Sequence, residues 1–220
     1  MKKIKNLAGA SFSNGLRLHR DSIALFKIGS IPSSYALSIL AQEEIGKAFL
    51  LAEIVFQDVD NNGLDLEYSK LILKCMRSHK VKQGWFSQQV GDFFKYPGKK
   101  YPKIFKDVYS GKLDEDKQNA IYVGVTKTDN KPDLMRGKII DPSKRTKPKQ
   151  AEKHITRVND FIIEFTEGCR RGILCADPEE VDELLTMGLV AELESLWPKK
   201  SKSSIAKLKK YRKYDIDEDC

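Results

Sequence analysis

Residues 33–58 read SSYALSILAQEEIGKAFLLAEIVFQD, and this stretch decides the fold class of the chain. Apolar residues occupy nearly every side of a helix drawn through it, which is typical of a helix at the centre of a protein. Ser33 or Ser34 can cap its start, and the turn sequence Asn61-Asn62-Gly63 follows its end. We therefore expect a mainly helical protein arranged around this helix.

Other helices are expected on both sides of the central one. Apolar spacing and a proline-containing start predict them over residues 11–29, 65–90, 149–175 and 177–196. Residues 91–118 lack this spacing, so they predict a long loop with one short helical turn near 102–110. The chain thus predicts a bundle with one irregular segment.

A small β-hairpin insertion is expected over about 119–141. Residues 120–125 are β-rich, and residues 137–140 can pair with them across a polar turn at 128–132. Residues 1–198 would then form one helical domain, followed by a tail over 199–220.

Charge is concentrated in that tail. The net charge of the chain is +8, and residues 199–213 alone contain eight Lys and Arg, followed by four acids. Such a tail predicts either added solubility or contact with nucleic acid. No run of about 18 apolar residues occurs, so we expect no membrane partner. The four cysteines form no CxxC pair and no signal peptide is apparent, which predicts a cytoplasmic location with reduced thiols.

Ionisable residues interrupt the central apolar helix. Glu43, Glu44 and Lys47 lie within two turns, and helical spacing predicts that Glu44 faces the interior. A buried carboxylate needs a partner, because an unpaired one costs several kcal/mol. Gly46 removes a side chain beside it, so another backbone or a ligand can approach closely.

The following helix offers that partner. His79 continues an apolar stripe that includes Ile72 and Phe86, and Lys80 and Lys82 bring positive charge to the same turn. A Glu and a His with nearby Lys form a minimal acid–base unit at neutral pH. The alternative is a satisfied core histidine whose polar contacts only fix the helix register. No HxxxH or comparable ligand motif is present, so no metal and no cofactor are expected.

The remaining histidines and a basic pair predict less. His19 lies between Arg17 and Arg20 and is expected on a solvated helix face, whereas His154 is expected at the boundary of the core. Arg170-Arg171 could bind phosphate or cap a helix end.

Four groups of residues resemble the AbiV family of bacterial abortive-infection proteins, which belongs to the HEPN superfamily. They are Asn14-x-Leu16-x4-Asp21-Ser22, Ser34-Tyr35-Ala36-Leu37-x2-Leu40-Ala41-x-Glu43-Glu44-x-Gly46-Lys47-Ala48, His79-Lys80-x-Lys82 and Ile121-Tyr122-Val123. The similarity spans about residues 11–175. It implies a HEPN-like helical bundle, a homodimer, and phage defence by shutting down host translation.

The resemblance also implies a chemistry. Many HEPN proteins are metal-independent ribonucleases whose Arg and His, four to six residues apart, line a cleft between protomers. No Arg precedes a histidine at that spacing here. Lys74, with four residues between it and His79, has the spacing with Lys in place of Arg. Lys can stabilise a phosphate charge but lacks the planar fork of Arg.

Two main classes of function therefore remain open, and a nucleotide-binding regulator is a third option with less support. The first is an endoribonuclease acting on tRNA, mRNA or rRNA; its catalytic residues would be His79, Glu44, Glu43 and Lys47, and its substrate-binding residues Lys74, Lys80 and Lys82. The second is a non-catalytic defence protein that binds a phage or translation-machinery protein. A phage-encoded activator is a candidate partner for either class.

Overall fold

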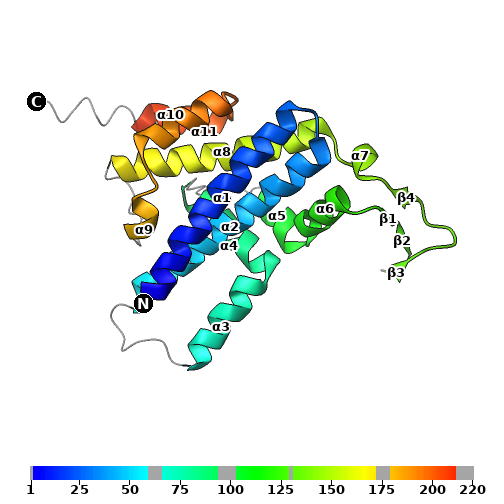
Figure 1. Ribbon diagram of the computed structural model, residues 1–220, viewed down its shortest axis with the longest axis horizontal. Helices are drawn as coiled ribbons and strands as arrows, with labels where there is room; N and C mark the ends of the chain where they lie inside the picture. The colour runs from blue at the N-terminus through cyan, green and yellow to red at the C-terminus, as the bar shows by residue number, and fades with distance from the viewer. Residues whose placement is uncertain (1, 59–65, 94–102, 129–130, 172–178, 212–220) are drawn as a thin grey trace, which may run out of the picture.

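Two long antiparallel helices begin the fold of the protein. The computed structural model describes residues 2–58, 66–93, 103–128, 131–171 and 179–211. Helix α1 (Lys2–Lys27) packs along α2 (Ile31–Asp58), and Gly29 in the turn between them has a φ of 82° (Figure 1). The predicted central helix is confirmed. The predicted start of α1 at residue 11 is wrong, because the residues before it also pack and Ala8 is fully buried.

Helix α2 is the centre of the bundle. It contacts α1, α4 (His79–Phe93), α6 (Lys112–Ile121) and α8 (Pro148–Arg170). Contact on so many sides explains its apolar surface, since each face is covered by a different neighbour. Its fully buried members include Ile39, Ala41, Ile45 and Leu51. The chain therefore has the mainly helical fold that was expected.

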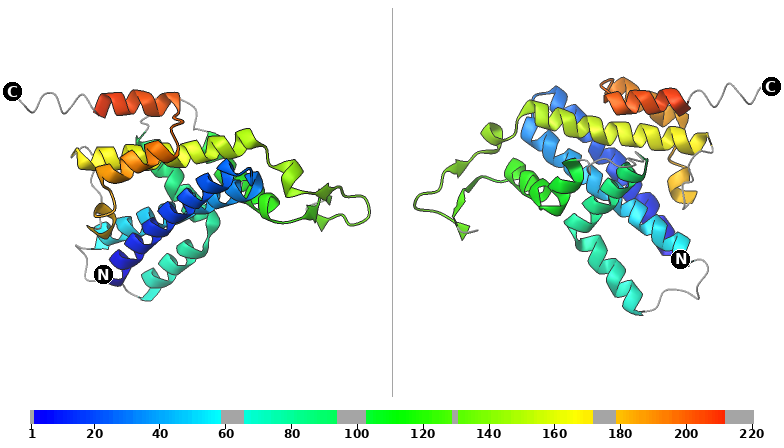
Figure 2. Two further views of the ribbon diagram at one scale, coloured as in Figure 1. Left: turned by 45° about the horizontal axis from the view of Figure 1, so that its top comes forward. Right: turned by 180° about the vertical axis from the view of Figure 1, so that it is seen from behind.

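The helix predicted over 65–90 is two helices. Helix α3 (Leu66–Arg77) ends one residue before Ser78, and α4 begins at His79. The Ser78 hydroxyl accepts a hydrogen bond from the Val81 backbone N–H at 3.3 Å, as a helix-capping residue does. Figures 1 and 2 show α3 extending away from the bundle at this break. His79 thus lies in the first turn of a helix rather than in its middle.

The loop predicted over 91–118 contains two helices. The expected short helix is present as α5 (Lys103–Tyr109), while residues 94–102 lie outside the described part. Helix α6 was not predicted; it follows Gly111, whose φ is 76°. Only Leu113, Lys117 and Ala120 of α6 are buried, so its apolar signal is weak.

The hairpin is present but shorter than predicted. Strand β1 (Gly124–Val125) pairs with β4 (Ile139–Ile140), and β2 (Lys127–Thr128) pairs with β3 (Lys131–Pro132), both antiparallel. Residues 120–121 end α6 instead of starting a strand. The hairpin projects from the bundle beyond α6 and α7 (Pro142–Arg145) (Figure 1).

The helix predicted over 177–196 is interrupted. Helix α9 (Glu179–Asp182) is separated from α10 (Met187–Leu196), and Thr186 caps α10 by accepting a hydrogen bond from the Leu189 N–H at 3.1 Å. Helix α10 ends before Trp197-Pro198, as predicted. The predicted helix start at residues 177–178 lies outside the described residues.

Part of the basic tail is folded. Helix α11 (Lys202–Tyr211) packs on α8 (Figure 2), and its residues Leu208 and Tyr211 are buried. The Lys207 ammonium of the same helix lies 3.1 Å from Glu164 Oε2 of α8. Within the ranges that the structure describes, no helix is both long and apolar enough to cross a membrane.

His19 is buried, so its predicted place on a solvated face is wrong. Its Nε2 lies 2.9 Å from Asn159 Oδ1, and the Asn159 amide donates to the Trp197 carbonyl at 3.3 Å. The amide oxygen therefore faces His19, and Nε2 carries the ring proton. Burial lowers the pKa of His19 from 6.5 to about 4. The hydrogen bond with Asn159 acts in the opposite direction, and the positive charge of Arg20 lowers the pKa further.

His19 makes the stability of the protein depend on pH. Between pH 6.5 and about 4 the unfolded chain protonates this imidazole and the folded chain does not, so stability falls as the pH falls. Between pH 7 and pH 4.5, we expect the free energy of unfolding to fall by about 2 kcal/mol less in the His19→Gln variant than in the wild type. Urea unfolding at both values measures this difference, and parallel losses in the two proteins would contradict it.

Candidate active site

Glu43, rather than Glu44, is the carboxylate that faces the interior. The side chain of Glu43 is 1 % exposed, whereas that of Glu44 is 18 % exposed. The prediction that Glu44 points inward is therefore wrong. Because α2 is apolar on nearly all sides, its sequence contains little information on which face meets which neighbour.

Glu43 is surrounded by donors from two other helices. Its Oε2 lies 2.6 Å from His79 Nδ1 and 3.8 Å from Lys82 Nζ, both in α4. Its Oε1 accepts from Gln83 Nε2 and from Lys117 Nζ of α6, each at 2.7 Å. Both oxygens of the buried carboxylate are thus paired, as burial of a charge requires. We call Glu43, His79, Lys82, Gln83 and Lys117 the Glu43 cluster.

The short contact with Glu43 determines the tautomer of His79. A carboxylate only accepts hydrogen bonds, so Nδ1 carries the proton that it donates to Oε2. In the neutral form of the ring, Nε2 then has a free lone pair. The His79 side chain is 48 % exposed, so this lone pair is accessible to a ligand. A buried acid that orients a half-exposed imidazole is the arrangement of a general base and its positioning carboxylate.

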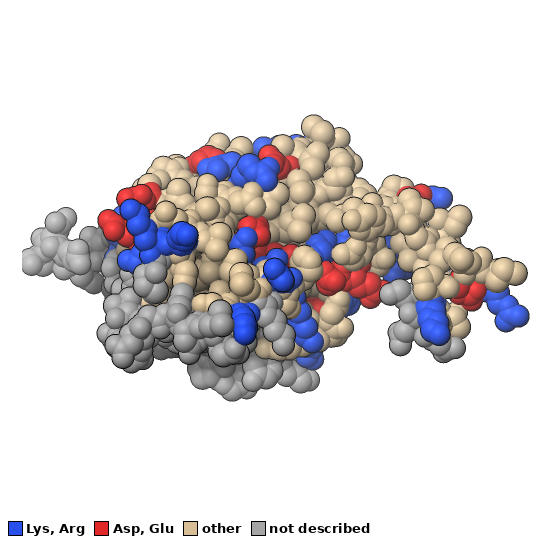
Figure 3. Space-filling view, turned by 60° about the horizontal axis from the view of Figure 1, so that its bottom comes forward, with Lys and Arg blue, Asp and Glu red and all other residues tan. Residues whose placement is uncertain are grey.

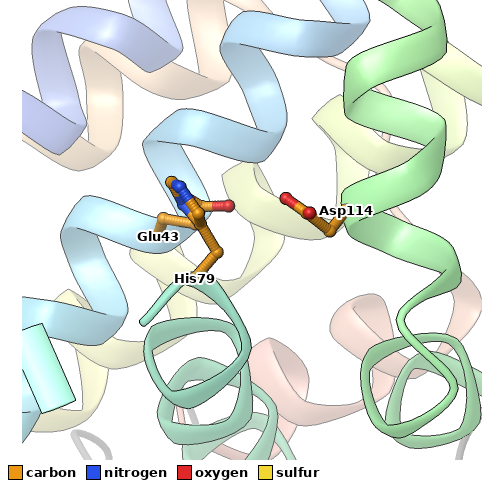
Figure 4. A group of neighbouring side chains, drawn as sticks. All are labelled: Glu43, His79 and Asp114. Atoms are coloured by element: carbon orange, nitrogen blue, oxygen red, sulfur yellow. The ribbon is translucent and has the colours of Figure 1, made fainter. Parts of the chain in front are cut away.

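Lys117 occupies the position that a metal ion could take. Oxygen and nitrogen atoms of Glu43, His79 and Asp114 lie within 4.8 Å of one another, a spacing that fits a cation (Figure 4). Lys117 Nζ lies 2.7 Å from Glu43 Oε1, 2.9 Å from Asp114 Oδ1 and 3.1 Å from His79 Nδ1. The lysine side chain is 3 % exposed. A covalently attached ammonium thus supplies the positive charge among these three groups, and a metal would have to displace it.

The cluster depends on a close approach of α4 to α2 at Gly46. A Cβ atom at this position would overlap the carbonyl oxygen of Lys82 and would lie 3.1 Å from the Phe86 backbone nitrogen. The expectation that Gly46 admits another backbone is confirmed. Because Lys82 lies three residues after His79, the same contact places the imidazole against Glu43.

Gly46→Ala is expected to move α4 away from α2. Backbone overlap cannot be relieved by a rotamer change, so we expect a loss of about 2 kcal/mol in the free energy of unfolding, together with separation of His79 from Glu43. The matched control is Gly84→Ala in α4, where an added Cβ meets nothing within 4 Å and helix propensity favours Ala. Urea unfolding of both variants tests this, and equal stabilities would contradict it.

The other predicted site residues lie apart from His79. Lys47 Nζ donates to Glu44 Oε2 at 2.6 Å, and Asn14 Nδ2 donates to the same oxygen at 3.3 Å. No hydrogen bond or ion pair in the described part of the chain joins Glu44 or Lys47 to His79. Both residues therefore belong to a separate polar group between α1 and α2.

The predicted phosphate-binding lysines are separated in the same way. Lys80 is exposed and Lys82 is buried beside Glu43, while the side chain of Lys74 lies outside what the structure describes. Sequence reasoning missed Gln83 and Lys117. The signal that could have revealed Lys117 is its position in the stripe Leu113-Lys117-Ala120, whose three members are the buried residues of α6.

His154 and the arginine pair have partners of their own. The predicted place of His154 at the edge of the core is wrong, because its side chain is buried and only 3 % exposed. Arg170 pairs with Asp182, and Arg171 Nε donates to Glu167 Oε2 at 2.9 Å. Neither arginine therefore points to a phosphate site.

Surface charge is mixed on the face that Figure 3 shows. On the face in Figure 3, Lys and Arg side chains lie next to Asp and Glu side chains over the coloured part of the surface. Basic residues form no continuous track there, so an RNA bound to this face would be held at separate points rather than along a groove.

One family model matches the chain. This model, HEPN_AbiV, describes the AbiV family and covers residues 3–163, which run from α1 into α8 and include Glu43, His79 and Lys117. No curated protein and no solved structure matches the chain.

Proposed function

Because this chain belongs to the AbiV family of HEPN abortive-infection proteins, we propose that it is a metal-independent endoribonuclease that shuts down host translation during phage infection. The observation that supports this proposal is the Glu43–His79 pair, in which a buried carboxylate holds Nδ1 and leaves Nε2 of a half-exposed imidazole as a base. The cytoplasm, where host RNA is found, is the proposed place of action.

The proposed reaction begins with proton removal from a ribose 2′-OH by His79 Nε2. The 2′-oxygen forms a bond to the adjacent phosphorus, and the bond from phosphorus to the 5′-oxygen of the next nucleotide breaks. That oxygen takes a proton from solvent water as it leaves, and the protonated His79 later returns its own proton to solvent, so the products are a 2′,3′-cyclic phosphate and a 5′-hydroxyl. Glu43 stabilises the imidazolium formed in between, and the exposed Lys80 binds the phosphate charge.

Lys117 has a supporting role in this scheme. It is buried, so it does not reach a phosphate; its ammonium pairs with Glu43 Oε1, while His79 contacts the other oxygen of the same carboxylate. The sum of the formal charges of Glu43, Asp114, Lys82 and Lys117 is zero, so the imidazole gains its proton in a neutral surrounding. The proposal therefore assigns the positive charge beside Glu43 to lysines rather than to a metal ion.

Incubation with total RNA and purified tRNA tests the proposal. Cleavage is expected in the presence of EDTA, and the fragments should carry 2′,3′-cyclic phosphate and 5′-hydroxyl ends. Intact RNA at high protein concentration would contradict the proposal, as would cleavage that requires an added divalent metal.

We also propose that the protein acts as a homodimer, in which a second copy supplies further phosphate-binding groups near His79. Light scattering should then give twice the chain mass of 25.1 kDa. A phage-encoded activator would be a further partner; in its absence the purified protein would cleave RNA slowly.

The hairpin favours the alternative of a non-catalytic defence protein. Leu134, Met135 and Ile139 on this projecting arm are 83 %, 93 % and 75 % exposed, as expected of a surface that binds another protein. Under this alternative, toxicity in cells would survive His79→Ala and would fail when these apolar side chains are replaced by Ser. The ribonuclease proposal expects the opposite result for His79.

A further inference from the structure

A pocket of 360 Å³ lies beside α6, away from the Glu43 cluster. It is lined by residues from α5, α6, α7 and α8 and by Tyr35 at the start of α2. Lys112, Asp116 and Asn119 of α6 line it, whereas helical spacing places Asp114 and Lys117 on the other side of that helix. Its volume lies in the range of sites that hold a small molecule.

The pocket contains a buried imidazole with an unsatisfied nitrogen. His154 lines the pocket and is 3 % exposed; its Nδ1 lies 2.7 Å from Ser38 Oγ, and its Nε2 has no partner. Ser38 forms no other hydrogen bond with the described residues, so its buried hydroxyl donates to Nδ1. Nε2 then carries the ring proton and is a donor without an acceptor, which burial makes unfavourable.

The charges around this donor favour an anion. Four cations, Lys112, Arg145, Lys153 and Arg157, line the pocket together with two carboxylates, Asp107 and Asp116. The excess is 4 − 2 = 2 positive charges. Burial and the neighbouring Arg157 hold the pKa of His154 well below its usual value, so the ring is a neutral N–H donor at pH 7.

Polar groups other than cations also line the pocket. Gln150 Nε2 donates to Tyr35 Oη at 3.0 Å and to Asp116 Oδ2 at 3.1 Å, and Lys112 Nζ lies 3.1 Å from Asp116 Oδ1. A fixed carboxylate and the Asn119 amide at one side can bind hydroxyl and amino groups, while the arginines and Lys153 bind oxyanions. The two kinds of group together match a sugar or base joined to a phosphate.

We propose that this pocket binds a free nucleotide, with its phosphate on Arg145, Lys153, Arg157 and the His154 N–H, and its ribose or base on Asp116 and Asn119. A bound nucleotide would fix α6 against α8. Since α6 also carries Lys117, a nucleotide that fixes this helix would also stabilise the contact of Lys117 with Glu43. This inference is independent of the reaction proposed for His79.

Isothermal titration calorimetry on the full chain tests the assignment. The probes are AMP, ATP, GTP, adenosine, inorganic phosphate and a short single-stranded oligonucleotide. Nucleotides are expected to bind, inorganic phosphate more weakly, and adenosine at least about tenfold more weakly than AMP, because charge-assisted hydrogen bonds to the phosphate are lost.

Paired variants locate the binding site. The double variant Arg145→Gln/Lys153→Gln should weaken nucleotide binding by at least about tenfold. The matched control is Lys144→Gln/Lys149→Gln, which removes the same charge from the same two helices outside the pocket. All four side chains are exposed, so both proteins should fold, and their urea unfolding curves verify this.

Three outcomes would overturn the proposal. One is that no nucleotide binds at millimolar concentration. Another is equal weakening in the two double variants, which would show general charge attraction. The last is binding of the oligonucleotide without binding of mononucleotides, which would make the pocket part of an RNA surface.

Discussion

His79→Ala is expected to lower RNA cleavage by about 100- to 10,000-fold, the usual contribution of a positioned general base. The variant should fold, because His79 is half-exposed and Glu43 keeps its hydrogen bonds from Gln83 and Lys117. Initial rates on tRNA, together with circular dichroism and urea unfolding, measure both properties. Cleavage within tenfold of the wild-type rate would remove His79 from the mechanism.

The two neighbouring glutamates provide a matched pair for the same assay. In Glu43→Gln, an amide replaces one of two oxygens that both accept hydrogen bonds, so one contact with His79, Gln83 or Lys117 becomes donor against donor. We expect cleavage to fall at least about 100-fold. Glu44→Gln changes a carboxylate that contacts Lys47 and Asn14, and its effect should be below tenfold. A larger loss of cleavage in Glu44→Gln than in Glu43→Gln would assign the positioning role to Glu44.

Lys117→Met is expected to destabilise the fold by about 3 kcal/mol, because it leaves the buried Glu43 carboxylate without its close cation. Lys82 remains, but its Nζ is 3.8 Å away. The double variant Glu43→Gln/Lys117→Met removes both charges and should recover most of the lost free energy. Urea unfolding of the wild type, the two single variants and the double variant gives the interaction energy.

Lys112→Met provides the control on the same helix. Lys112 pairs with Asp116 at the surface, with half of its side chain exposed, so we expect a change of about 0.5 kcal/mol or less. Additive effects of the Glu43 and Lys117 changes would contradict the contact between them. If Lys117→Met does not fold at all, recovery of a folded protein in the double variant still tests the pair.

The central part of the fold could be predicted because its sequence is unambiguous. Helix α2 is apolar over seven turns, and α8 has an apolar residue at every third or fourth position. The same property of α2 concealed the site, since a helix that is apolar all round does not indicate which of Glu43 and Glu44 faces a given neighbour. Only the packing of α4 and α6 distinguishes them.

Two further features lay beyond the sequence pattern for physical reasons. The apolar stripe through Ile72 and Phe86 stays in phase across Ser78, so the break between α3 and α4 leaves little trace in the spacing. Helix α6 reads KLDEDKQNAI, in which charge dominates and only one side is buried. Its stability comes from packing on α2, which a local pattern does not contain.

The three elements that build the Glu43 cluster are far apart in the chain: Glu43 and His79 are separated by 36 positions, and Glu43 and Lys117 by 74. The chain up to the end of α6 must therefore have left the ribosome before the Lys117 ammonium can contact the Glu43 carboxylate. The Glu43 cluster is therefore complete only after α6 has packed on α2, so its formation depends on contacts between segments that are distant in the sequence.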